Sequence, residues 1–419
     1  MRSNLQHYRW IESRLPRPPK RRVVVLTGAR QTGKTTVAQT AFGDLRYVNL
    51  DDVEARGSLR EIRTTSWAQT VGNAVLDEAQ KEPAVFDKVK YAFDGKKIDF
   101  TVLLGSSRIL LLEQIRETLA GRAFLYDLWP LMLSELLAPS GEEPLRPLLD
   151  ELLRAEGSIR SALEAQPETL IGEPAERRLS ALEHLARWGG MPALLALNDE
   201  DRRSWLRSYR QTFLERDLAD LVRLKDLEPF RKLQELAMLR SGQLLSYSEL
   251  ARDAGVSPAT ARRYLEYLNL SYQVVLLRPY SRNLTSTVVK SPKLYWMDLG
   301  LSREVTASHG ELTGAELETQ LDAESHKWIR TMAPNEKLYF YRTRSRMEVD
   351  LLLETPRGVM AVEVKNRGQA YPEDARALAE LRGPLGSSWL GGLVVYRGTR
   401  LQPLREADGI WAVPAHQLF

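Results

Sequence analysis

The sequence predicts an α/β protein whose first domain is built on a parallel sheet, and two observations lead to this prediction. Residues 23–27 read Val-Val-Val-Leu-Thr, a short β-branched apolar run that is typical of a buried parallel strand. The next residues, 28–35, read Gly-Ala-Arg-Gln-Thr-Gly-Lys-Thr, the spacing G-x-x-x-x-G-K-T of a phosphate-binding loop. Residues 34–40 contain neither Gly nor Pro, so they can open a helix whose amino terminus faces a phosphate.

The residue types of this loop match the shape of a triphosphate. Its glycines let backbone N–H groups close around phosphate oxygens, while Lys34 can reach the β- and γ-phosphates and Thr35 can place its hydroxyl on Mg²⁺. The alternative is a glycine-rich turn that matches by accident, but strand, loop and helix follow in the required order. We therefore expect ATP and Mg²⁺ as ligands, with nucleotide contacts from Gly28, Ala29, Arg30, Gln31, Thr32, Gly33, Lys34, Thr35 and Thr36.

Composition restricts the class of protein without naming a function. The 419 residues are enough for two to four domains, and 43% hydrophobic with 27% charged residues is ordinary for a soluble protein. No apolar run approaches the roughly 20 residues of a membrane helix, and the Arg-rich amino terminus lacks the apolar stretch of a secretory signal. Cysteine is absent, which excludes disulfides and thiolate metal sites and favours a cytoplasmic location. The net charge of +4 permits nucleic-acid binding without requiring it.

Two more apolar runs end in residues suited to hydrolysis. One leads directly into Asp77 and Glu78, of which Asp77 can hold Mg²⁺ through water and Glu78 can polarise the attacking water. An acidic strand end near solvent is the alternative. The run at residues 100–104 ends in Gly-Ser-Ser, where Ser106 or Ser107 can touch the γ-phosphate or position the water. A serine here suits a helix N-cap equally well.

Arg122 precedes a fifth apolar stretch at residues 123–128. An arginine beside the nucleotide can neutralise charge that develops at the γ-phosphate, and such an arginine finger is worth about three to five decades in rate. We expect Arg122 in this catalytic role. The alternative is an ordinary salt-bridge partner.

Four motifs occur in one order: residues 28–35, the Leu-Asp-Glu-Ala-Gln run at 76–80, Gly-Ser-Ser at 105–107 and Leu-Ala-Gly-Arg at 119–122. Together they resemble the prokaryotic AAA+-like P-loop ATPases that carry a C-terminal domain of formerly unknown function. The resemblance implies an additional-strand core. It also supports Lys34 and Thr35 for nucleotide and Mg²⁺, Asp77 for Mg²⁺, Glu78 as base, and Ser106 and Arg122 near the nucleotide. Since AAA+-type relatives often act in rings, it is compatible with a homo-oligomer.

We expect four domains along the chain. After the ATPase core at residues 1–135, a Leu-, Ala-, Glu- and Arg-rich region at 136–230 predicts a helical lid over the nucleotide. A winged helix-turn-helix follows at 231–300 and a nuclease-like domain at 301–419.

The winged helix is predicted from residues 245–277. A helix, a tight turn and a second helix capped by Ser257, with Pro258 at its first position, have the helix-turn-helix spacing, and a strand follows for the wing. Arg262, Arg263 and Tyr264 are expected to face outward and to contact DNA. The alternative is a structural lid or a contact with protein.

The last domain is predicted as helix, three strands, helix and strand. Asp350 interrupts an apolar strand, and Glu363 shares a strand face with Lys365 because side chains alternate with period two. Two carboxylates and a lysine can hold Mg²⁺ and activate water, and Glu318 in the preceding helix is a further candidate ligand. The set resembles the PD-(D/E)xK nuclease superfamily. The alternatives are a salt-bridge network between the charged residues or an inert DNA-binding domain.

Three functions are compatible with these expectations. The first is a DNA-stimulated ATPase that remodels or processes branched or duplex DNA. The second is an ATP-gated, Mg²⁺-dependent DNA nuclease. The third is a signalling NTPase switch whose other modules bind proteins.

Overall fold

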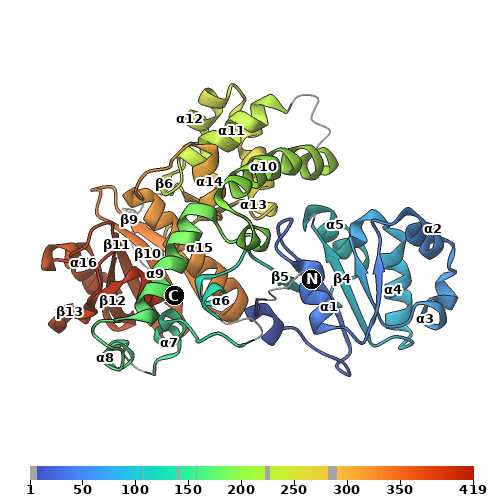
Figure 1. Cartoon of the computed structure of the whole chain (residues 1–419), viewed down its shortest axis with the longest axis horizontal. Helices are drawn as coiled ribbons and strands as arrows, with labels where there is room; N and C mark the ends of the chain where they lie inside the picture. Colours follow the sequence, from blue (N-terminus) through green and yellow to red (C-terminus); the bar gives the residue numbers. More distant parts are fainter. Residues whose placement is uncertain (1–6, 107, 139–141, 157, 222–226, 282–289) are drawn as a thin grey trace.

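The computed structural model describes residues 7–106, 108–138, 142–156, 158–221, 227–281 and 290–419 (Figure 1). The first domain (blue) lies at one end of the long axis and the C-terminal sheet (red) at the other. In this view the helices of residues 199–221 and 228–270 (green and yellow) lie above the middle of the molecule, whereas those of residues 148–164 lie below the C-terminal sheet. None of the described helices is both long enough and apolar enough to cross a membrane.

A parallel five-stranded sheet forms the first domain. Its strands are β1 (Arg22–Thr27), β2 (Arg46–Asn49), β3 (Ala74–Asp77), β4 (Phe100–Gly105) and β5 (Ala123–Asp127). Its helices are α1 (Lys34–Ala41), α2 (Val53–Glu61), α3 (Trp67–Thr70), α4 (Ala84–Asp94) and α5 (Arg108–Thr118). The strand order is β2-β3-β4-β1-β5, and every pair is parallel. Because β4 separates β1 from β3, the predicted additional-strand core is confirmed.

Both faces of this sheet are buried, as expected of a parallel sheet. Side chains alternate along β1, so Val23 and Val25 pack into one core with α4, while Val24 and Leu26 pack into another with α1. In a parallel sheet all carboxyl ends lie at one edge. The phosphate-binding loop, Asp77 and Gly105 therefore come to the same edge.

The helices predicted as a lid divide between two other cores. They are α6 (Leu133–Leu137), α7 (Leu148–Arg154), α8 (Arg160–Glu164), α9 (Glu173–Trp188) and α10 (Asp199–Leu221). Leu149 and Leu152 of α7 pack against the C-terminal sheet, whereas Leu206 and Tyr209 of α10 pack in a core with buried residues from 230 to 301. Burial of these apolar faces between domains makes the region a connector.

Two backbones touch where α9 ends beside α14 (Leu299–Val305). The Gly190 N–H donates to Asp298 Oδ2 at 3.0 Å. A Cβ placed on Gly300 would lie 2.0 Å from the carbonyl carbon of Trp188. This close approach requires glycine at residue 300 and explains the breaker sequence Gly189-Gly190.

The helix-turn-helix unit comprises α11 (Glu228–Leu239), β6 (Gln243–Leu244), α12 (Tyr247–Ala254), α13 (Pro258–Leu270), β7 (Val274–Leu277) and β8 (Lys293–Trp296). Ser246 and Ser257 cap α12 and α13 by accepting from Glu249 N and Thr260 N. Gly255 turns the chain between them with φ of 72°. The strands pair antiparallel in the order β6-β8-β7. Within residues 245–277, α12, the turn, α13 and β7 follow one another in the predicted order.

A mixed six-stranded sheet forms the C-terminal domain. The elements are α15 (Gly314–Met332), β9 (Lys337–Arg342), β10 (Glu348–Thr355), β11 (Gly358–Lys365), α16 (Arg376–Leu385), β12 (Trp389–Tyr396), β13 (Gln402–Arg405), β14 (Ile410–Pro414) and α17 (Ala415–Leu418). The order is β13-β14-β12-β11-β10-β9. The predicted helix, three strands, helix and strand are present. The sequence does not predict β13 and β14, because both are short and each contains a proline, Pro403 or Pro414.

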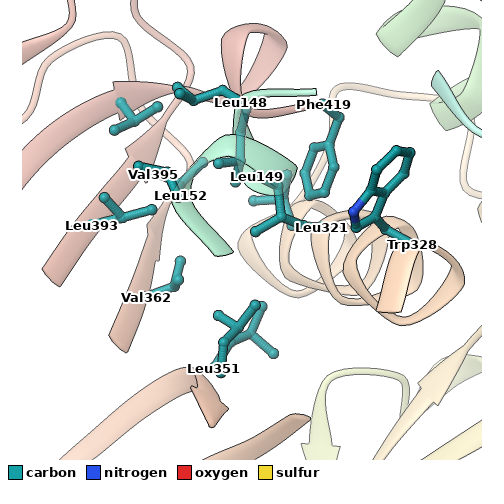
Figure 2. Close-up of a cluster of buried hydrophobic side chains, with 14 of the residues drawn as sticks. Leu148, Leu149, Leu152, Leu321, Trp328, Leu351, Val362, Leu393, Val395 and Phe419 are labelled. Carbon is teal, nitrogen blue, oxygen red and sulfur yellow. The ribbon is translucent and has the colours of Figure 1, made fainter. Parts of the chain in front are cut away.

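One core joins α7 and α15 to a face of this sheet (Figure 2). The side chains shown there come from α7, α15, three strands and the end of the chain: Leu148, Leu149, Leu152, Leu321, Trp328, Leu351, Val362, Leu393, Val395 and Phe419. Trp10, near the amino terminus, packs edge-on against Trp328 with ring centroids 5.2 Å apart. Residues from the two ends of the sequence therefore share this core, while α16 covers the opposite face.

Candidate nucleotide site and charged clusters

The loop between β1 and α1 has the backbone that its glycines permit. Gly33, directly before α1, has φ of 94°, in the left-handed region that favours glycine. A Cβ on Gly28 would lie 2.2 Å from the Leu128 carbonyl oxygen, so no larger residue fits there. Lys34 Nζ donates to the carbonyl oxygens of Gly28 at 3.0 Å and Ala29 at 2.8 Å. The ammonium is thus held over its own loop, where phosphate oxygens can replace the carbonyls.

Beside the loop, Asp77 and Thr35 make direct contact. Thr35 Oγ1 donates to Asp77 Oδ2 at 2.6 Å, and the Tyr47 hydroxyl on β2 donates to the same oxygen at 2.7 Å. Burial and the Asp77 carboxylate raise the pKa of Tyr47, so Tyr47 stays a donor. A hydroxyl and a carboxylate at the start of α1 and the end of β3 fit a magnesium ion bound with nucleotide. Tyr47 is a contact that the sequence analysis missed.

The carboxylate of Glu78 lies next in this arrangement. Glu78 adopts φ of 52°, and Ser106 Oγ and Gln80 Nε2 donate to its Oε2 at 3.2 Å and 2.5 Å. A left-handed residue other than glycine costs energy and marks a constrained position. The structure therefore brings Lys34, Thr35, Asp77, Glu78 and Ser106 to one edge of the sheet. Ser107 lies outside the described residues.

Of the other loop residues, Thr32 and Ala29 are buried, and Gln31, Thr35 and Thr36 are exposed. Thr32 Oγ1 donates to Ala29 O at 2.9 Å and stiffens the loop. Tyr209 of α10 donates to Arg30 O at 3.4 Å. Helix α10 therefore touches the loop although most of the connector packs elsewhere.

The prediction that Arg122 lies near the nucleotide is wrong for a nucleotide bound by the same chain. Arg122 directly precedes β5, and Val23 at the start of β1 pairs with Ala123, so the residue lies at the edge of the sheet opposite the loop. Its guanidinium pairs with Asp94 at 2.6 Å. A strand of five residues spans roughly 17 Å at about 3.3 Å per residue, too far for one arginine side chain to cross.

Another arginine, Arg108, lies at the correct edge. It begins α5 directly after β4, two residues beyond Ser106. It lies 3.8 Å from Asp127 Oδ2, and its guanidinium carbon lies 5.1 Å from the centroid of the Tyr272 ring. Arg108 was not predicted, although its place just after the Gly-Ser-Ser motif is a signal in the sequence.

Asp127, at the end of β5, connects the first domain to the helix-turn-helix unit and to the C-terminal domain. Its carboxylate accepts from the hydroxyl of Tyr272, in the helix-turn-helix unit, at 2.7 Å and from Arg330 of α15 at 3.1 Å. Arg108 and these partners hold the pKa of Asp127 below its usual value, although burial opposes them. The carboxylate is therefore ionised, and it joins the nucleotide edge to both distant units.

A second buried contact fixes the loop from the amino-terminal side. The Arg9 guanidinium donates to Thr32 O at 2.7 Å and to Trp129 O at 2.5 Å, and pairs with Glu135 at 3.1 Å. Arginine presents several donors in one plane, which suits this bridging position. No local pattern around residue 9 signals the contact.

On α13, the three predicted DNA contacts separate into two kinds. Arg262 and Arg263 are exposed, and the Arg262 guanidinium lies 4.7 Å from the centroid of the Tyr247 ring. Tyr264, in contrast, is 5% exposed and its ring packs 5.0 Å from that of Phe230. Its outward prediction is wrong because Ala261, Tyr264, Leu265 and Leu268 form one continuous helix face toward α11 and α12.

The four predicted nuclease residues lie together in the C-terminal domain. The register Leu351↔Val362 makes Asp350 and Glu363 neighbours on β10 and β11, and Asp350 Oδ2 accepts from Val364 N at 2.8 Å. Lys365 pairs with Glu363 at 2.6 Å. Glu318 and Asp350 both face an unpredicted partner, Lys293 of β8.

A magnesium ion at this cluster does not fit the arrangement described here. An ammonium already lies between Glu318 and Asp350, and no three His, Asp or Glu side chains among the described residues gather in a way that could hold a metal ion. Burial and the Asp350 charge raise the pKa of Glu363 to about 8, and burial raises that of Glu318 to about 7.

Comparisons with known proteins follow the same division of the chain. Residues 20–137 match a family model described as an AAA domain. Residues 179–311 and 314–418 match two models described as domains of unknown function, DUF8612 and DUF4143. Together with the strand order, these matches show an AAA-like P-loop ATPase domain joined to a C-terminal domain of the DUF4143 type. The predicted resemblance is confirmed for the AAA-like core and for the presence of a C-terminal domain of unknown function.

Among curated proteins, the chain is similar to an uncharacterised protein of Mycobacterium tuberculosis and to an uncharacterised protein of Mycobacterium bovis. Each is 29% identical over 406 residues, covering 95% of this chain and 81% of the relative.

Among solved structures, a Walker-type ATPase of Pyrococcus abyssi matches with 15% identity and a TM-score of 0.39, over 68% of this chain and 90% of that one. A signal transduction ATPase with a tetratricopeptide repeat sensor, from Pyrococcus horikoshii, matches with 14% identity and a TM-score of 0.25, over 75% of this chain and 44% of that one.

Proposed function

We propose that this chain binds and hydrolyses ATP with Mg²⁺ and uses hydrolysis to act on duplex or branched DNA. The observation that carries the ATPase part is the convergence of the loop with Asp77, Glu78 and Ser106 at one sheet edge. Lys34 is assigned to the β- and γ-phosphates, Thr35 and Asp77 to the metal, and Glu78 to the attacking water. The metal supplies charge neutralisation at the phosphates.

Arg108 replaces Arg122 in this proposal as the arginine that meets the γ-phosphate within one chain. It begins the helix after Ser106, and its ion pair with Asp127 is long, at 3.8 Å. This distance is beyond that of a hydrogen bond, so the guanidinium can exchange one anionic partner for another. Arg122 keeps the structural role of a partner for Asp94.

The DNA part of the proposal is supported by α13. Arg262 and Arg263 are exposed on the second helix of a helix-turn-helix, the position from which such units contact DNA. Glu266 on the same side limits the positive charge, so we assign these arginines to phosphate contacts rather than to base recognition. Phosphate contacts predict binding that weakens strongly with salt.

The experiment is ATP hydrolysis measured with Mg²⁺ in the absence and presence of duplex, single-stranded and branched DNA. We expect stimulation by duplex or branched DNA. The Lys34→Ala variant should lose ATP binding, and Glu78→Gln should bind ATP while its turnover falls about 100-fold or more, as for loss of a catalytic base. Normal turnover by Glu78→Gln would remove Glu78 from the mechanism.

The DNA assignment has its own control. Arg262→Ala/Arg263→Ala should abolish the stimulation by DNA, while Arg231→Ala/Lys232→Ala, which removes two positive charges from α11 of the same unit, should leave it intact. If no DNA changes the rate, the ATPase assignment stands and the signalling switch becomes the better description of the other domains.

A further inference from the structure

Lys293 is an unusual residue to find buried at the start of the central strand of a sheet. It lies on β8, opposite Leu277 of β7 and Leu244 of β6, and its side chain is 2% exposed. Lysine is almost never fully buried unless its charge is paired. The partners of Lys293 must therefore account for its position.

All three carboxylates around the Lys293 ammonium belong to the C-terminal domain. Nζ lies 2.7 Å from Glu318 Oε1, 2.5 Å from Glu348 Oε1 and 3.6 Å from Asp350 Oδ1. The first residue is on α15 and the other two are on β10. Two positions along β8, the Tyr295 hydroxyl donates to the same Glu318 oxygen at 2.5 Å. One strand of the helix-turn-helix unit thus inserts two donors into the neighbouring domain.

This cluster has more acidic than basic side chains. Its acids are Glu318, Asp322, Glu348, Asp350 and Glu363, and its bases are Lys293, Lys365 and Arg342. Asp322 is completely buried, and neither of its carboxylate oxygens has a hydrogen-bond partner in the described structure. Lys365 and Arg342 each reach one carboxylate, whereas Lys293 reaches three. Lys293 is therefore the central cation of the cluster.

We propose that the Lys293 ammonium has two roles. It holds the helix-turn-helix unit to the C-terminal domain, and it excludes divalent metal ions from the space between Glu318, Glu348 and Asp350. An ammonium and a divalent ion need the same carboxylate oxygens, because Mg²⁺, Mn²⁺ and Ca²⁺ all prefer oxygen ligands. Both cannot occupy the space between Glu318 and Asp350. This inference does not depend on ATP hydrolysis or on DNA binding.

The test is Mn²⁺ binding to the full chain without nucleotide. Titration calorimetry and the electron paramagnetic resonance signal of free Mn²⁺ both measure this binding. We expect Lys293→Met to bind one Mn²⁺ at this cluster with an affinity at least tenfold higher than that of the natural chain. Adding Asp350→Asn to Lys293→Met should remove that ion. The matched control is Lys365→Met, which removes one positive charge from the same cluster and should bind like the natural chain because Lys293 remains.

Two results would overturn the proposal. One is equal Mn²⁺ binding by the natural chain and Lys293→Met, and the other is a gain in Lys365→Met as large as that in Lys293→Met. Should Lys293→Met not fold, the natural chain gives a second measurement. An amine-acylating reagent read by mass spectrometry should modify exposed Lys232 and Lys290 at least tenfold faster than Lys293. Equal rates of modification would show that Lys293 is not held between the two domains.

Discussion

The hydroxyl of Tyr272 lies 2.7 Å from Asp127 Oδ1 and 2.5 Å from Thr27 Oγ1. Tyr272 is in the turn after α13, while Thr27 ends β1 directly before the phosphate-binding loop. The Tyr272 ring also packs edge-on against Trp129 at 5.0 Å. These contacts join the end of β1 to the turn that follows the helix carrying Arg262 and Arg263. This contact connects the nucleotide edge directly to the unit that carries the candidate DNA-binding surface.

Tyr272→Phe removes this hydroxyl and keeps the ring. We expect DNA to stimulate ATP hydrolysis less than a third as well as in the natural chain, because Asp127 and Thr27 lose their common partner. The free energy of unfolding should fall by about 1.5–3 kcal/mol, the usual worth of a hydrogen bond to a charged group. Stimulated hydrolysis and urea unfolding measure the two effects. Tyr267→Phe, on α13 but outside this contact, is the control, and equal behaviour of the two variants would contradict the role of Tyr272.

Arg108→Ala and Arg122→Ala separate the two candidate arginines. If Arg108 meets the γ-phosphate, its removal should lower kcat about 100-fold or more, since arginine fingers supply large rate factors. Arg122→Ala should change kcat by less than about threefold, because its partner is the exposed Asp94 and surface ion pairs contribute little. Single-turnover ATP hydrolysis is the measurement. The reverse ranking would indicate that Arg122 acts on the nucleotide of a neighbouring copy.

Tyr264→Ala tests the corrected position of this residue. Because the ring is buried against Phe230, its truncation should destabilise the protein by about 3–5 kcal/mol, as for other large aromatic residues in cores. Arg263→Ala, one position earlier and exposed, should change stability by less than about 0.5 kcal/mol. Chemical unfolding followed by tryptophan fluorescence gives both values. If Tyr264→Ala changed stability little but abolished DNA binding, Tyr264 would face outward as the sequence predicts.

Glu363 predicts a pH dependence of stability. Burial and Asp350 raise the pKa of Glu363 from 4.5 to about 8, so between these values the folded chain holds a proton that the unfolded chain has lost. This contribution to stability is complete below pH 4.5 and is lost as the pH rises through 8.

We therefore expect the free energy of unfolding to fall between pH 5 and pH 8, by up to about 1.4 kcal/mol per pH unit from this group. Glu363→Gln should flatten the slope because the amide does not titrate. Glu380→Gln, a half-exposed residue of α16, is the control. Parallel pH profiles for all three proteins would contradict the assignment.

Local sequence determined much of the first domain. The β-branched run at 23–27, the glycines of the loop and the acidic end of β3 each impose their own backbone, so the sheet edge with Lys34, Thr35 and Asp77 could be predicted. The same holds for α12, α13 and their serine caps. In these segments the signal lies within a few neighbouring residues, and tertiary contacts did not overrule it.

The tertiary structure decided which charged residue meets which partner. Arg122 was predicted from its place before the fifth apolar stretch and from the Leu-Ala-Gly-Arg motif. A parallel strand carries its first residue to the far edge of the sheet, however, and leaves Arg108 near the loop. Lys293 gave no local signal, because its three partners lie 25 to 57 positions further along the chain (318 − 293 and 350 − 293). Long-range charge pairing depends on how domains pack, and that packing is not encoded in any short stretch of sequence.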